Sequence, residues 1–123
     1  MKVPILKQGP YLIASVQSAL TDEDLVQLRD DLAQMVGRHH SRGVIIDVTA
    51  LDVMDSFAAR TLRSMAATIK LKGAHAIIVG IQPEVAFAMV QLGLSLAGVS
   101  TALDLEDGLA LLAKQMQENQ DGG

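Results

Sequence analysis

The sequence predicts a single α/β domain, with a mostly parallel or mixed β-sheet flanked by about four helices. Strand-like and helix-like segments alternate in the order β-β-α-β-α-β-α-β-α, which favours right-handed crossovers between parallel strands. Two uninterrupted apolar runs, Val44–Ile46 and Ala76–Val79, are typical of strands that are buried on both faces. The length of 123 residues suits one domain. We expect this domain to span residues 1–117 and residues 118–123 to form a flexible C-terminal tail.

The N-terminal part predicts two short strands and a long helix. The segments Ile5–Leu6 and Leu12–Val16 flank a Gln-Gly-Pro breaker, which indicates a hairpin-like pair. Thr21 comes before three acidic residues, as expected of an N-cap and an acidic first turn. Gly37 and the basic residues after it end the helix. Its predicted inner face carries Leu25, Leu28, Leu32, Met35 and Val36.

Three further helices follow the two buried strands. The helix after Val44–Ile46 is closed by Gly73, the next begins near Pro83, and the last opens with Asp104 and Asp107. Val99–Ala102 is the expected last strand. The predicted inner faces carry Leu62, Met65, Ala66 and Ile69 in the second helix, Val85, Ala88, Met89 and Leu92 in the third, and Leu105, Leu109, Leu112 and Met116 in the fourth.

Composition excludes several classes of function. The chain has no cysteine, so disulfides and thiolate metal sites are ruled out. Its net charge of -4 and its three aromatic residues argue against nucleic-acid binding. Val85–Leu103 carries no charge, but polar residues and glycines interrupt it, which favours a soluble segment over a membrane span. With no signal-peptide pattern either, we expect a cytoplasmic protein.

Three aspartates gather where the first buried strand meets the next helix. Asp47, Asp52 and Asp55 could bind a metal or act as an acid–base pair, or they could cap turns. No glycine-rich phosphate loop precedes a helix. His39 and His40 are poorly placed to bind the same metal ion, because neighbouring residues of a helix point in different directions. We therefore favour the turn-capping role and predict no catalytic residue, no metal site and no cofactor. A small nucleotide- or metal-binding enzyme remains the alternative from another class.

Ser56 stands at the junction between this acidic loop and the second helix. Its hydroxyl could serve as the N-cap of the helix, and the same exposed position would suit a phosphate acceptor. Phe57 beside it could be a packed staple or an anchor for a partner.

The segment Val44–Phe57, together with the element order, resembles the STAS family, named for sulfate transporters and anti-sigma-factor antagonists. In that family a hydrophobic strand leads to an Asp-Ser or Asp-Thr pair at the start of the second helix, and here the pair is Asp55-Ser56. Pro4–Lys7, Gly80–Pro83 and Thr101–Leu105 resemble the RsbS-type stressosome scaffold proteins of this family. The similarity runs from about Val3 to Leu112.

The resemblance implies a non-enzymatic phospho-switch and scaffold. It implies that an RsbT-type serine/threonine kinase phosphorylates Ser56 and is released from a surface that includes Asp52, Asp55 and Phe57. It also implies RsbR-type STAS paralogues and an RsbX-type phosphatase as partners, with a homodimer and a large hetero-oligomeric assembly. A second phospho-threonine of RsbR-type relatives falls at Ala88, which cannot be phosphorylated. The alternative within the family is an RsbV-like anti-sigma-factor antagonist that binds an anti-sigma kinase.

Overall fold

The computed structural model describes residues 3–17, 20–96 and 98–121, and within them it forms one sheet of five strands with four helices. The order of elements is the predicted one. The elements are β1 (Ile5–Gln8), β2 (Tyr11–Ser15), α1 (Asp22–His39), β3 (Gly43–Asp47), α2 (Ser56–Leu71), β4 (His75–Val79), α3 (Pro83–Gln91), β5 (Ser100–Ala102) and α4 (Leu105–Asp121).

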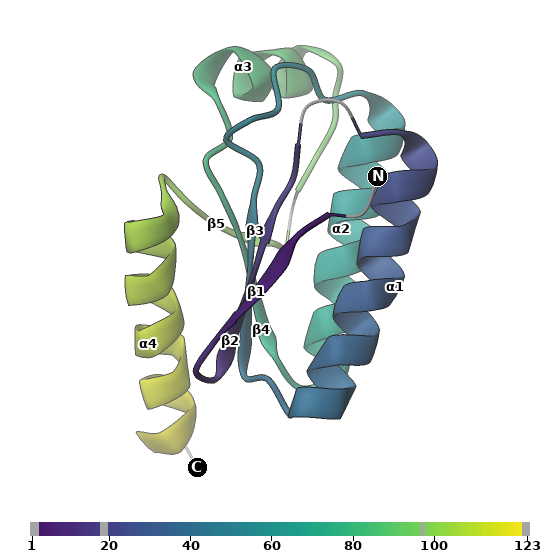
Figure 1. Cartoon of the computed structure of the whole chain (residues 1–123). Helices are drawn as coiled ribbons and strands as arrows, with labels where there is room; N and C mark the ends of the chain where they lie inside the picture. Colours follow the sequence, from purple (N-terminus) through teal and green to yellow (C-terminus); the bar gives the residue numbers. More distant parts are fainter. Residues whose placement is uncertain (1–2, 18–19, 97, 122–123) are drawn as a thin grey trace.

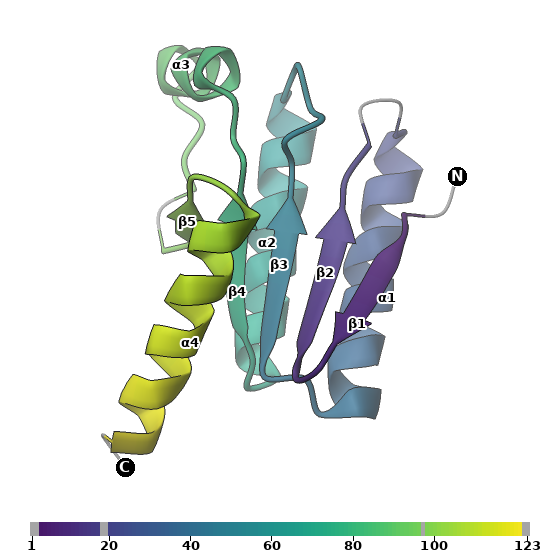
Figure 2. The ribbon, with the colours of Figure 1, turned by 60° about the vertical axis from the view of Figure 1, so that its left-hand side comes forward.

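The sheet follows the chain, with the strand order β1-β2-β3-β4-β5. β1 runs antiparallel to β2, and all other neighbours are parallel. The carboxyl ends of β2 to β5 therefore lie at one end of the molecule, and the loops that leave them gather there (Figure 2). This arrangement confirms the prediction of a mixed, mostly parallel sheet.

Helices cover both faces of the sheet. α1 and α2 pack side by side on one face, α4 covers the other, and α3 lies beyond the carboxyl ends of the strands (Figure 1). Strand side chains alternate between the faces, so Val44 and Ile46 join the core beneath α1 and α2, while Ile45 joins the smaller core beneath α4. The smaller core consists of Ile13, Ile45, Ile77, Val79 and Leu112.

α4 lies very close to the sheet, and two glycines make this possible. A Cβ on Gly43 of β3 would stand 2.8 Å from Cδ2 of Leu112, and one on Gly108 of α4 would stand 2.6 Å from Cγ1 of Val79. A larger residue at either position would force Leu112 or Val79 to shift within the packed core.

The helical inner faces were predicted well for α1 and α2 and less well for the others. All four predicted residues of α2 are buried. In α3, Val85 and Met89 are buried, but the prediction was wrong for Ala88 and Leu92, which are exposed. Leu105 of α4 is exposed as well. The physical reason is that Val85 and Met89, one turn apart, form a narrow buried line, Ala88 lies to one side of that line, and Leu92 comes after Gln91, the last residue of the helix.

The expected end of the domain at residue 117 and the flexible tail at residues 118–123 stay predictions. α4 continues to Asp121, past residue 117, and residues 122–123 lie outside the described residues. The uncharged stretch Val85–Leu103 is divided between α3, a connecting segment and β5. Across the described ranges, no helix has the length and apolarity that crossing a membrane demands.

Candidate functional site

The β3–α2 loop, residues 48–55, carries Ser56 at the carboxyl end of the sheet. Leu51 and Met54 are buried and insert this loop into the core, whereas Asp52 is exposed and Val53 is 78% exposed. A main-chain hydrogen bond of 2.9 Å from the N–H of Leu51 to the carbonyl of Val48 closes a turn at its start. The loop is thus held from below by apolar contacts and presents its polar residues outward.

Asp47, the last residue of β3, holds the beginning of this loop in place. Its Oδ1 accepts a hydrogen bond from the N–H of Thr49 at 2.9 Å and another from the Thr49 hydroxyl at 2.6 Å. The side chain of Gln82 donates from Nε2 to the Thr49 carbonyl at 2.6 Å. Gly80 is buried against Thr49 with φ 81°, a conformation and a close approach that both require glycine. Asp47 is therefore occupied in fixing a turn, as the turn-capping interpretation expects.

Asp55 is the N-cap of α2. Its Oδ1 accepts from the N–H of Ala58 at 2.8 Å, and its carbonyl accepts from the N–H of Ala59 at 3.0 Å. Ser56 is then the first residue of the helix, and the interpretation of Ser56 as the cap was wrong. The physical reason is that Asp and Ser compete as equally good caps, and here the extended conformation falls on Asp55.

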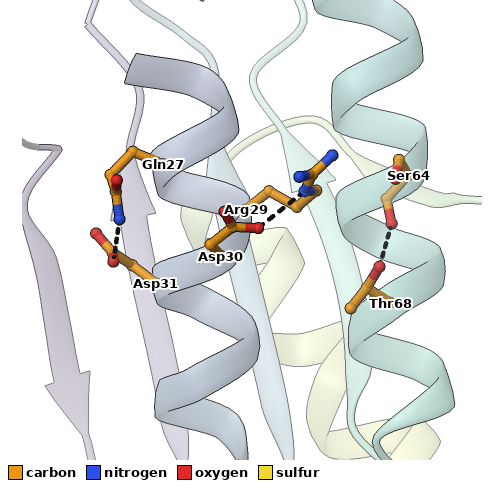
Figure 3. A network of polar contacts seen from close by, with 6 residues as sticks. All are labelled: Gln27, Arg29, Asp30, Asp31, Ser64 and Thr68. Atoms are coloured by element: carbon orange, nitrogen blue, oxygen red, sulfur yellow. Dashed lines mark hydrogen bonds and ion pairs between the residues drawn. The ribbon is translucent and has the colours of Figure 1, made fainter. Parts of the chain in front are cut away.

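The Ser56 hydroxyl differs from the threonine hydroxyls of α2. Ser56 is exposed, and no hydrogen bond joins its side chain to another residue in the described part of the chain. Thr61 is buried and donates to the carbonyl of Phe57 at 2.8 Å. Thr68 donates to the carbonyl of Ser64 at 2.9 Å (Figure 3). Ser64 is exposed too, but it lies two turns into the helix and away from its positive N-terminal end.

Phe57 is half-buried, and its role as a packed staple or as an anchor for a partner stays a prediction. It lines a shallow groove of about 330 Å³ between α1 and α2, together with Val26, Arg29 and Arg60. Arg29 is itself paired with Asp30, at 3.2 Å (Figure 3). A second hollow, of about 210 Å³, is lined by Leu25, Leu51, Val53 and Asp55, among others.

Sequence reasoning missed an apolar surface on α3. Phe87 is 67% exposed and Val90 is 78% exposed, and α3 lies at the end of the molecule where α2 begins (Figure 2). The signal was available, because α3 is apolar all round except for Glu84 and Gln91, and such a helix is usually covered on every side.

The titratable side chains do not form a metal centre in the described ranges. Asp47 and Asp55 bind main-chain groups, and the histidines lie at the other end of the sheet, where α1 ends and β4 begins. The carboxyl whose pKa is clearly moved is Asp24 at the start of α1, where the Thr21 N–H lowers the pKa of the carboxyl below its usual value.

A domain model described as "STAS domain" matches residues 2–107. The RsbT co-antagonist protein RsbRA of Bacillus subtilis is 32% identical over 83 residues, which are 68% of this chain and 30% of that protein. RsbRC of the same bacterium is 37% identical over 65 residues, which are 53% of this chain and 23% of that protein. The chain thus spans less than a third of the length of these two relatives.

Solved structures of STAS proteins are similar to this chain as well. A serine-to-glutamate variant of RsbS from Moorella thermoacetica has a TM-score of 0.82 and 32% identity, covering 95% of this chain and 99% of that chain. A chain from a structure of the stressosome, described as a signal integration and transduction hub, has a TM-score of 0.79 and 33% identity, covering 93% and 99%. The anti-sigma factor antagonist SpoIIAA, at 12% identity and a TM-score of 0.64, shares the fold. The chain therefore belongs to the STAS domain family.

Proposed function

We propose that this chain is a non-enzymatic phospho-switch and scaffold of a stressosome, and that Ser56 is the residue that is switched. The observation that carries the proposal is the position of Ser56. It is an exposed hydroxyl in the first turn of α2, directly after a loop that buried residues and the Thr49–Gln82 hydrogen bond hold in place. A kinase can reach such a hydroxyl without unfolding any part of the domain.

A phosphate on Ser56 would change the surface far more than the fold. It adds about -1.5 to -2 charges, so the net charge of -4 would become about -6. The N-terminal end of α2 favours that charge by about 0.3 to 1 kcal/mol, while Asp52 and Asp55 oppose it. A partner docked on this surface would have to strip water from the phosphate or bear its electrostatic repulsion, and either would weaken binding by several kcal/mol. The phosphate would thus act by releasing a partner.

The proposed partner at this surface is an RsbT-type serine/threonine kinase, which the unmodified protein holds through Asp52, Asp55 and Phe57. RsbR-type STAS paralogues would complete the assembly, and an RsbX-type phosphatase would restore Ser56. Similarity to proteins named RsbT co-antagonists and to a stressosome chain supports the RsbR-type and RsbT-type partners of this set. An RsbV-like antagonist would use the same serine with a different kinase, and a pull-down from lysate separates the two proposals by the kinase recovered.

The direct test is phosphate transfer from radioactive ATP by an RsbT-type kinase. Wild-type protein should be labelled and Ser56→Ala should not, while Ser64→Ala, which removes the other exposed hydroxyl of α2, should be labelled like wild type. Circular dichroism should be the same for all three proteins. Labelling that persists in Ser56→Ala would place the switch elsewhere.

A further inference from the structure

The exposed apolar side chains of this chain gather at one end of the molecule. In α3, Phe87 and Val90 lie one turn apart and are both exposed, while Val85 and Met89 are the buried residues of the helix. Within the described ranges, eight large apolar side chains are exposed, and six of them belong to α3 or to segments that follow the carboxyl ends of β3, β4 and β5: Val53, Phe87, Val90, Leu92, Leu103 and Leu105. Apolar side chains that gather on a surface among polar residues mark a site of interaction.

α3 is tied to the loop that precedes Ser56. Gln82 is the N-cap of α3, yet its side chain does not cap the helix. Its Nε2 donates instead to the carbonyl of Thr49 in the β3–α2 loop, at 2.6 Å. Both views place α3 and this loop next to each other, beyond the carboxyl ends of the strands (Figure 1, Figure 2). A partner that reaches Ser56 therefore approaches the apolar face of α3 as well.

The chain separates its charges between the two ends of the sheet. Nine of its 14 acidic residues, and none of its 10 lysines and arginines, lie in the helix starts and loops at the carboxyl end: Asp22, Glu23, Asp24, Asp52, Asp55, Glu84, Asp104, Glu106 and Asp107. At the amino end, the segments 36–43 and 69–76 hold four cations, all three histidines and no acidic residue. The end that carries Ser56 and α3 is thus the acidic end, and the electric field around the chain has a direction.

This distribution of charge decides what kind of partner suits the apolar face. A second copy that docked through the same end would bring two acidic surfaces together, and like charges across an interface oppose binding. An anionic membrane or a nucleic acid would meet the same repulsion. The surface is complementary to a protein that presents an apolar patch surrounded by lysine or arginine. The acidic end would also draw such a protein toward Ser56 and away from the basic end.

We propose that the kinase of Ser56 docks on α3 as well as on the β3–α2 loop, and that it presents a basic face with an apolar centre. Phe87 and Val90 contact the apolar centre, and Asp52 and Glu84 face basic groups around it. Ser56 itself faces the anionic phosphates of the nucleotide, so a phosphate on Ser56 is repelled there although the surrounding face is basic. This inference rests on the proposed function for the identity of the kinase. It adds a second docking element and the chemistry of the partner's face.

Truncation of the two exposed side chains of α3 tests the docking element. Phe87→Ala and Val90→Ala should each raise the dissociation constant of an RsbT-type kinase by about tenfold, as the loss of an apolar anchor does. In steady-state phosphorylation both should raise KM and leave kcat unchanged, because Ser56 is untouched. Leu71→Ala, at an exposed leucine at the opposite end of the sheet, is the matched control and should bind like wild type. Circular dichroism should be the same for all of these proteins.

Charge reversal tests the chemistry of the partner's face. Glu84→Lys at the start of α3 should slow association with the kinase by about threefold at low salt, and the difference should shrink as salt is added. Glu118→Lys makes the same change of net charge at an exposed residue near the end of α4, at the opposite end of the sheet. It should leave the association rate nearly unchanged. Stopped-flow mixing at two salt concentrations measures both variants.

The outcomes separate the docking surface from the switch. Binding of Phe87→Ala and Val90→Ala as tight as that of wild type would overturn the role of α3, whereas labelling of Ser56 would still support the switch. Faster association of Glu84→Lys would show that the partner's face is not basic. If the two α3 variants altered sedimentation of the chain alone and not kinase binding, a second copy would cover α3 and the inference would be wrong. A kinase that binds no form of the chain would overturn the proposed function and this inference together.

Discussion

The starts of α1 and α2 lie at the same end of the molecule (Figure 1). They differ in how much fixed negative charge their first turns carry. α1 begins with a capping box, in which Thr21 accepts from the N–H of Asp24 at 3.1 Å and Asp24 accepts from the N–H of Thr21 at 3.0 Å. Its first turn already holds Asp22, Glu23 and Asp24. α2 begins with one capping carboxylate, from Asp55, and its first turn holds no acidic residue.

The difference shows what a switchable helix start needs. The favourable end of the α1 dipole is already occupied by fixed carboxylates, so a further negative charge there would meet repulsion. The first turn of α2 keeps its positive end available and offers a neutral hydroxyl at Ser56. A negative charge can therefore be added and removed at α2 with little effect on the helix, and the change is passed to whatever touches the surface.

The largest expected effect is on capture of the RsbT-type kinase. Phosphorylation of Ser56 should weaken binding by about a hundredfold or more, since a few kcal/mol of desolvation and repulsion correspond to at least two powers of ten. Ser56→Asp should weaken it only partly, because a carboxylate adds about one charge against about 1.5 to 2 for phosphate. Ser56→Ala should keep tight binding. Titration calorimetry at low and high salt measures all four states.

The salt dependence of kinase binding separates electrostatic repulsion from the cost of burying the phosphate. Repulsion at the rim is screened over a Debye length of about 8 to 10 Å, whereas the cost of burying the phosphate persists at high salt. Equal affinity of the phosphorylated and unmodified proteins would show that the electrostatic-release mechanism is wrong, even if Ser56 is the phosphosite.

A smaller effect, on the free energy of unfolding, tests whether Asp55 or Ser56 caps α2. Asp55→Ala should lower the free energy of unfolding by about 1 kcal/mol, because it leaves the N–H of Ala58 without its cap. Ser56→Ala should change it by less than about 0.5 kcal/mol, as expected for an exposed residue without a hydrogen bond. Urea unfolding of both variants, with Thr21→Ala as the corresponding cap removal in α1, gives the comparison. If Ser56→Ala cost as much as Asp55→Ala, the helix would be capped by Ser56 in solution.

The smallest expected effect is on how the free energy of unfolding depends on pH. The hydrogen bond from the Thr21 N–H holds the pKa of Asp24 below the ordinary value of 3.8, so the ionised form is stabilised by folding. That contribution is present above the ordinary pKa and is lost as the pH falls through the lowered folded value. Asp24→Asn should therefore be less stable than wild type near neutral pH, and the two unfolding curves should converge in acid. A difference that stays constant down to low pH would contradict this linkage.

The local patterns predicted most of the architecture because they depend on near neighbours. The order of elements and the buried face of α2 follow from alternation and helical spacing, which a long, firmly packed helix obeys. α3 is the exception. It is short and stands off the end of the sheet, so only Val85 and Met89 reach the core, and spacing alone assigned Ala88 and Leu92 to the wrong side.

At the candidate site, the sequence by itself determined the segment and the resemblance, down to the Asp55-Ser56 pair. It could not decide which of the two caps the helix, because either residue type serves and only the backbone conformation chooses.

Tertiary structure alone decided what holds the loop that precedes Ser56. Thr49 and Gln82 are far apart in the chain and meet only because β3 and β4 are neighbours in register. Hydrogen bonds and packing between distant segments depend on the closed sheet, and no local spacing in the sequence encodes them.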